Sequence, residues 1–229
     1  MTTFRFTLKG LRVPFRAKKR RRGLEVEYEG LVGRLITSAT SASAAPVVGV
    51  TACSYGEGVT TIATNLAAAA GRSLEGNTLL VDAHTDQPEV ERLFGLDAGP
   101  GTCEALAGQR LVQDCTQLTQ VPRLAVMGPG AEAISSGFHR PETWHGFVES
   151  LRRSFQLVLV DLPPVPKLLS QVTVAQSLDG ILLVVRAERT RTKVAQRYRD
   201  QLARVNPQIL GIVLNGRRTY VPNWLYQRI

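Results

Sequence analysis

The sequence predicts an α/β fold with a mostly parallel sheet and helices on both faces. Short runs of consecutive apolar residues, each the length of a buried strand, alternate along the chain with segments of helical periodicity. No apolar run reaches the roughly 18 residues that a membrane-spanning helix needs. The 229 residues are enough for one substantial domain and few for two.

The expected elements follow in order along the chain. Continuous apolar runs predict strands at 47–53, 77–83, 123–130, 155–164, 180–187 and 209–216. Helical periodicity predicts helices at 24–39, 60–74, 139–154 and 191–205. Small residues near 38–46 predict a linker that ends at Pro46. Residues 25–229 therefore form one predicted domain, whose ligands should bind at the carboxyl ends of the strands.

Residues 1–24 are predicted to be a basic, flexible arm. Nine of the 28 lysines and arginines lie within residues 1–22, which contain no acid, so the rest of the chain carries 19 basic and 19 acidic side chains. Apolar residues alternate with these charges, as at Phe4, Phe6 and Leu8. This pattern favours contact of residues 5–22 with an anionic membrane surface or a partner protein. An inert tail and a nucleic-acid contact stay open as less favoured alternatives.

Cysteines and the N-terminus indicate the compartment. Cys53, Cys103 and Cys115 have neither metal-ligand spacing nor a CxxC pattern, so we expect free thiols in a reducing cytoplasm. The first residues lack a continuous apolar stretch followed by a cleavage site, so no signal peptide is expected.

The stretch CSYGEGVTT, residues 53–61, has the glycines and threonines of a phosphate-binding loop. Such a loop, between a strand and a helix, offers successive backbone N–H groups to phosphate oxygens. The candidate nucleotide-binding residues are Gly56, Glu57, Gly58, Val59, Thr60 and Thr61. Val59 stands where the strict pattern has lysine. Taken alone, the stretch fits an ordinary tight strand-to-helix turn equally well.

Two aspartates strengthen the case for a nucleotide. Asp82 and Asp161 each end a predicted buried strand after the glycine loop. Carboxylates in this position hold Mg²⁺ or its waters beside a bound phosphate, and the hydroxyl of Thr60 stands where a loop threonine would bind the same ion. The candidate magnesium ligands are therefore Thr60, Asp82 and Asp161.

Four segments resemble one family, the cytoplasmic tyrosine kinases of bacterial capsule and exopolysaccharide export. This family is a branch of the P-loop ATPases and is related to the partitioning ATPases. Residues 50–67 resemble its phosphate loop, and 79–108 and 155–190 resemble its second and third motifs. Residues 209–216 resemble its last strand, so the likeness covers roughly residues 25–218.

The resemblance implies a P-loop NTPase-like fold, ATP and Mg²⁺ as cofactors, and Asp82 and Asp161 as catalytic residues. The family's tyrosine-rich tail, its autophosphorylation target, corresponds to Tyr220 and Tyr226. The implied partner is a polysaccharide chain-length regulator or export protein of the inner membrane. The implied location is cytoplasmic and peripheral at that membrane.

The chain departs from the family at charged positions. Val59 replaces the loop lysine, His84 the second acid of an Asp-x-Asp motif, and Ser170 an acid after the third motif. Gly30 and Gly33 replace two arginines of a helix that builds a ring of subunits in the family, which leaves the oligomeric state open. Phosphoryl transfer depends on charge stabilisation, so these losses should impair turnover more than binding.

The favoured hypothesis is therefore a catalytically weak or inactive tyrosine kinase-like protein that regulates or scaffolds polysaccharide export. Lys167, Arg186 and Arg191 are candidates for a substitute charge. The first alternative is an active tyrosine autokinase. The second is a partitioning-type ATPase, for which the loop lacks the early signature lysine at Cys53 and Ser54.

Overall fold

The computed structural model describes residues 4–7, 22–39, 45–85, 87–130, 141–206 and 208–216. Among these residues one eight-stranded sheet has the order β1-β8-β7-β2-β6-β3-β5-β4. Neighbouring strands are parallel except β4 and β5, which are antiparallel. The strands are β1 (Phe4–Thr7), β2 (Val47–Ala52), β3 (Thr78–Asp82), β4 (Gln117–Leu118), β5 (Leu124–Met127), β6 (Leu157–Asp161), β7 (Gly180–Arg186) and β8 (Ile209–Asn215).

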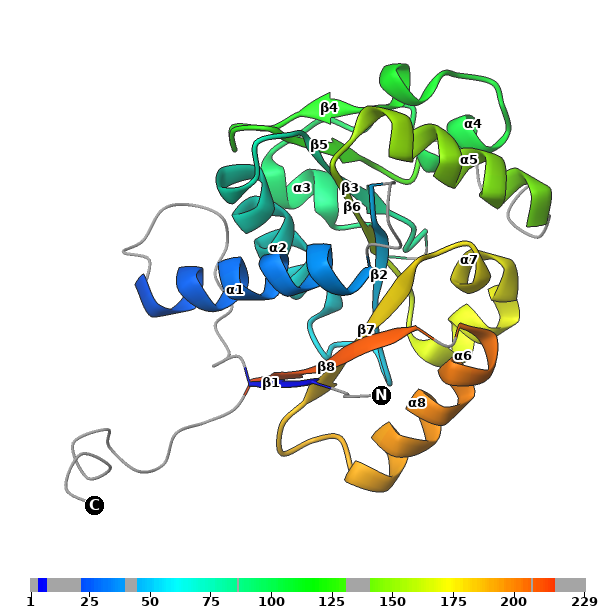
Figure 1. Ribbon diagram of the computed structural model, residues 1–229. Helices are drawn as coiled ribbons and strands as arrows, with labels where there is room; N and C mark the ends of the chain where they lie inside the picture. Colours follow the sequence, from blue (N-terminus) through cyan, green and yellow to red (C-terminus); the bar gives the residue numbers. More distant parts are fainter. Residues whose placement is uncertain are drawn as a thin grey trace.

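Helices cover both faces of this sheet (Figure 1). Helices α1 (Arg22–Ala39) and α2 (Val59–Ser73) pack on one face, with α3 (Val90–Phe94) at its side. The opposite face carries α4 (Thr102–Leu106), α5 (Pro141–Ser154), α6 (Val165–Leu168), α7 (Val172–Gln176) and α8 (Thr192–Val205). Two short 3₁₀ helices are η1 (Val112–Cys115) and η3 (Leu169–Gln171). The α/β fold with a mostly parallel sheet is therefore confirmed.

The central strands explain why the sequence shows continuous apolar runs. Successive side chains of β2 point to opposite faces: Val47 belongs to the core under α5, and Val48 and Val50 to the core under α2. All six residues of β2 are buried. A strand covered on both faces requires apolar side chains at odd and even positions alike.

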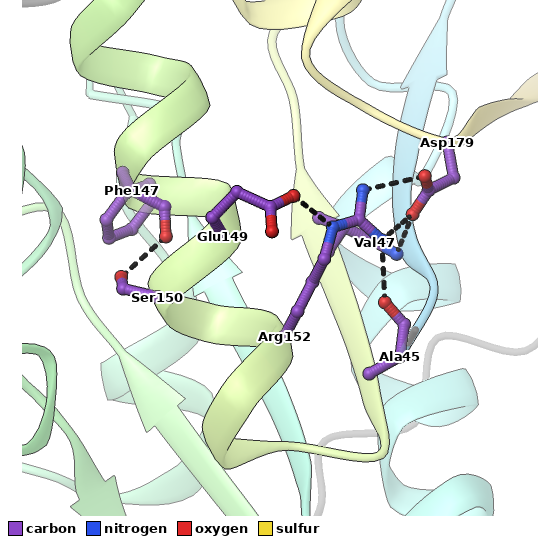
Figure 2. A network of polar contacts seen from close by, with 7 residues as sticks. All are labelled: Ala45, Val47, Phe147, Glu149, Ser150, Arg152 and Asp179. Atoms are coloured by element: carbon purple, nitrogen blue, oxygen red, sulfur yellow. Dashed lines mark hydrogen bonds and ion pairs between the residues drawn. The ribbon is translucent and has the colours of Figure 1, made fainter. Parts of the chain in front are cut away.

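An arginine network holds the amino-terminal end of the sheet (Figure 2). Arg152 at the end of α5 donates two hydrogen bonds to Asp179, of 2.6 and 2.7 Å, and a third of 2.8 Å to the Ala45 carbonyl. Its Nε donates to Glu149 at 3.0 Å. Asp179 also accepts the Val47 N–H at 2.6 Å. The start of β2, the start of β7 and the end of α5 are thus fixed together.

Short elements differ from the sequence-based expectation. Two parts of the predicted flexible arm have regular structure: residues 4–7 pair with β8 and form the edge of the sheet, and α1 begins at Arg22. Four residues are too few to show a recognisable strand pattern in the sequence. The strand forms because its backbone pairs with that of β8. The rest of the arm lies outside the described residues, as do residues 40–44 of the predicted linker. The flexible arm and the linker stay predictions there.

Candidate functional site

The phosphate loop follows β2 and leads directly into α2. Gly56 and Gly58 have φ values of 75° and 96°, a region of backbone conformation that favours glycine. A Cβ at Gly58 would collide with the Asn215 side chain from the end of β8. The first helical hydrogen bond runs from the Ile62 N–H to the Gly58 carbonyl at 3.0 Å. The N–H groups of the first turn therefore have no partner within the helix and can donate to an anion.

Glu57 braces this loop from inside. Its side chain is buried, and one carboxylate oxygen accepts the Cys53 N–H at 3.0 Å while the other accepts the Thr190 hydroxyl. Asn215 donates to the Glu57 carbonyl at 2.8 Å. Burial raises the pKa of Glu57, and these hydrogen bonds partly offset the rise. The carboxylate thus holds the shape of the loop and points away from the position predicted for a ligand's contacts, which leaves the backbone of Glu57 for such contacts.

Asp82 and Asp161 lie opposite each other, at the carboxyl ends of β3 and β6. Both are buried. Burial raises the pKa of Asp82 to about 6. Burial, together with the Asp82 charge, raises the pKa of Asp161 well above its ordinary value, and the Thr60 hydroxyl partly offsets this. The structure therefore brings together the three predicted magnesium ligands.

The two carboxylates differ in what they contact. Asp82 accepts hydrogen bonds from the N–H groups of His84 at 3.0 Å and of Glu89 and Val90 at 3.3 Å, so it also caps the start of α3. Within the described part of the chain, neither oxygen of Asp161 has a well-formed hydrogen bond. A buried carboxylate with no partner is costly, and a divalent cation would satisfy it.

The rings of Tyr55, in the phosphate loop, and His84, two residues after Asp82, stack on each other. Their ring centroids are 5.7 Å apart, with an angle of 28° between the planes. His84, predicted at the site, therefore lies against the phosphate loop. Tyr55, which is 47% exposed, was missed because an aromatic in a glycine loop carries no pattern of its own.

The remaining predicted residues are placed as follows. Val59, Thr60 and Thr61 form the first turn of α2, and Val59 packs against the core under α1 and α2. The Ser170 hydroxyl donates to the Lys167 carbonyl at 2.6 Å and is exposed. Tyr220 and Tyr226 lie outside the described residues.

A metal site built from protein side chains alone is not found in the described part of the chain. There, no three Cys, His, Asp or Glu side chains gather as such a site would need. Two carboxylates and a hydroxyl instead match an ion held jointly by the protein, a phosphate and waters, which is how Mg²⁺ is commonly bound. Among the described residues, no helix has the length and apolar character to cross a membrane.

Comparisons with known proteins agree with this geometry. No protein-family model matches the chain. The tyrosine-protein kinase CpsD of Streptococcus agalactiae serotype III is 26% identical over 171 residues, 74% of this chain and 73% of that protein. The crystal structure of the chimerical protein CapA2B2 covers 93% of this chain, with 94% of its own chain matched, a TM-score of 0.81 and 20% identity.

A second structural neighbour is an ATPase-like protein with a bound nucleotide. The septum site-determining protein MinD of Pyrococcus horikoshii OT3, solved with Mg-ADP, has a TM-score of 0.64 and 22% identity. It covers 80% of this chain, and 76% of its own chain is matched. The fold is that of the P-loop ATPases. In this chain, Val59 stands where the phosphate-loop pattern has lysine. The chain is a homologue of the bacterial tyrosine-protein kinases.

Proposed function

We propose that this protein binds ATP with Mg²⁺ at the phosphate loop and transfers phosphate weakly or not at all. The observation that carries the proposal is the pair of buried aspartates beside Thr60, of which Asp161 has no well-formed hydrogen bond to either oxygen among the described residues. Two carboxylates buried side by side reduce stability unless a proton or a cation neutralises part of their charge. The Mg-ADP bound by a structural neighbour supports the same assignment.

Thr60, Asp82 and Asp161 would hold the magnesium ion. When bound, the ion neutralises phosphate charge. The protein's own groups bind the remaining phosphate oxygens through the N–H groups at the start of α2, which lies next to Gly58. These contacts bind the ground state of a nucleotide without needing a lysine.

This chain has fewer of the charged side chains that phosphoryl transfer needs. Val59 packs against the core instead of presenting an ammonium group, and His84 and Ser170 replace acids of the family pattern. Each lost charge-assisted contact is worth about 1.5–3 kcal/mol. Such losses weigh on the transition state, where phosphoryl charge must be stabilised. The nucleotide would then act as a signal that sets the conformation of a regulator or scaffold.

The process regulated would be polysaccharide assembly at the inner membrane, through a chain-length regulator or export protein. Two observations support this part of the proposal: the homology to the tyrosine-protein kinases, and the many lysines and arginines within residues 5–22. Sedimentation with vesicles tests the membrane contact. Binding to vesicles with anionic lipid, but not to neutral ones, is expected, and equal binding to both would contradict an electrostatic contact.

Calorimetry with Mg·ATP on the full chain tests the central proposal. The wild type should bind, and Val59→Lys should bind about tenfold more tightly because the ammonium adds one charged phosphate contact. Val26→Lys is the matched control, since it adds the same charge on the exposed surface of α1. If neither the wild type nor Val59→Lys binds at millimolar ATP, nucleotide binding is excluded.

Labelled ATP then separates a weak kinase from an active one. We expect no tyrosine phosphorylation above the level of Asp161→Asn. Phosphate on Tyr220 or Tyr226 that appears with the wild type and is lost in Asp161→Asn would make the protein an active autokinase instead. Asp97→Asn, an exposed aspartate, controls for the loss of one negative charge.

A further inference from the structure

The turn between β7 and α8 brings two arginines to the phosphate loop. Arg186 ends β7 and donates from Nη1 to the Gly56 carbonyl at 3.0 Å. The turn then folds back, with hydrogen bonds from the N–H groups of Arg189 and Thr190 to the Arg186 carbonyl. Nη1 of Arg189 lies 3.8 Å from the position that a Cβ on Gly56 would take. Two guanidinium groups thus converge on the same loop glycine.

The backbone of this turn is shaped for that arrangement. Glu188, between the two arginines, has a φ of 64°, which non-glycine residues adopt rarely. Such backbone strain persists where surrounding contacts hold it, often at ligand sites. Here the contact between Thr190 and the Glu57 carboxylate ties the far side of the turn to the loop.

Most of the charge on these two arginines is available to a ligand. Arg186 uses one of its five N–H donors on Gly56 in the described contacts. For Arg189 the described residues show no ion pair or side-chain hydrogen bond, and it is exposed. Its positive charge nevertheless acts on the loop, because it offsets part of the rise that burial causes in the pKa of Glu57.

We propose that Arg186 and Arg189 supply to the phosphate chain of the bound nucleotide the positive charge that Val59 cannot. The ligand class is a nucleoside di- or triphosphate, whose oxygens suit the planar guanidinium donors. A second observation points to a ligand at this loop: Asp161 is buried beside Thr60, and among the described residues neither of its oxygens has a well-formed hydrogen bond. The inference rests on the proposed function. It selects Arg186 from the three sequence-based candidates for a substitute charge, and adds Arg189.

Calorimetry with Mg·ATP on the full chain tests the inference through Arg189→Ala. This residue is exposed, so its loss should leave the fold intact, which thermal unfolding checks. We expect Arg189→Ala to weaken binding about tenfold, as one charge-assisted contact predicts. Arg197→Ala is the matched control, because it removes the same charge from an exposed position on α8. It should change affinity less than about twofold.

A double variant gives an independent readout. Val59→Lys should improve binding more in the Arg189→Ala background than in the wild type, because the lysine then replaces a lost charge. Arg186→Lys keeps the charge at Gly56 and should retain more affinity than Arg186→Ala. Equal affinities of Arg189→Ala, Arg197→Ala and wild type would overturn this inference alone. A wild type that binds no Mg·ATP would overturn both the inference and the proposed function.

Discussion

The two ends of the parallel sheet differ in how their charged side chains are paired. At the amino end, Arg152 and Asp179 neutralise each other through two hydrogen bonds, and Asp179 also accepts the Val47 N–H. At the carboxyl end, Asp82 and Asp161 carry the same sign and lie side by side with raised pKa values. The charges of the first arrangement offset each other, whereas those of the second repel each other.

This difference separates charged residues that stabilise the fold from charged residues that oppose folding. A matched pair contributes to stability when its hydrogen bonds are satisfied, as those around Arg152 are. Like charges buried together reduce stability, and clusters of perturbed carboxylates mark functional sites. The comparison predicts that neutralising a residue has opposite effects at the two ends.

The largest effect is expected at the amino end. Asp179→Ala leaves the half-buried Arg152 without its main partner and the Val47 N–H without an acceptor. We expect a loss of about 3 kcal/mol in the free energy of unfolding, measured by urea denaturation. Asp200→Ala removes the carboxylate of an exposed arginine pair on α8 and should cost less than about 0.5 kcal/mol. Similar losses in both variants would contradict a structural role for the network.

At the carboxyl end, neutralising a carboxylate is expected to raise the free energy of unfolding instead of lowering it. Asp161→Asn removes a buried charge without changing the size of the side chain, so the protein in EDTA at pH 8 should become more stable by about 2 kcal/mol. Stabilisation by Mg·ATP should shrink in the same variant. Asp97→Asn should alter neither quantity. A marked loss of stability in EDTA would instead make Asp161 a structural hydrogen-bond acceptor and remove the contrast between the two ends.

The pH dependence of stability gives a smaller effect of the same origin. The pKa of Asp82 is raised to about 6, so its contribution to stability is full below the unfolded pKa near 4 and is lost as the pH rises through 6. Asp161 acts in the same direction. Without Mg²⁺, stability should fall by about 1 kcal/mol between pH 5 and pH 7.5 from Asp82 alone. A flat profile that Asp82→Asn leaves unchanged would show that the carboxylates are not linked to folding.

The sequence was sufficient to predict the carboxyl end of the sheet better than the amino end. Asp82, Asp161 and the glycine loop each follow a buried strand, and parallel strands place such residues at one edge. Arg152 and Asp179 are 27 residues apart on different elements, and neither stands in a pattern that distinguishes it from a surface charge. Their pairing depends on how α5 packs, which periodicity alone does not specify.

The sequence also did not predict which way individual side chains point or how the short strands pair. Glu57 was predicted in the phosphate loop as a nucleotide-binding residue, and its carboxylate turns inward to Cys53 and Thr190. Strands β1 and β4, of four and two residues, are too short to carry alternation and exist because a neighbouring strand pairs with them. Arg189 was missed because its approach to Gly56 follows from the turn after β7.

The smallest predicted effect tests how closely the phosphate loop is fitted to the end of β8. Gly56→Ala and Gly58→Ala both place a side chain at positive φ, so backbone strain lowers the free energy of unfolding in both variants. At Gly56 the nearest atom leaves room for a Cβ, whereas at Gly58 the new methyl group collides with Asn215. Gly58→Ala should therefore lose about 1 kcal/mol more stability than Gly56→Ala. Adding Asn215→Ala should remove that excess, because the amide that blocks the methyl group is gone. If the excess persists in the double variant, the cost arises in the loop backbone itself, and Asn215 serves only to hold the Glu57 carbonyl.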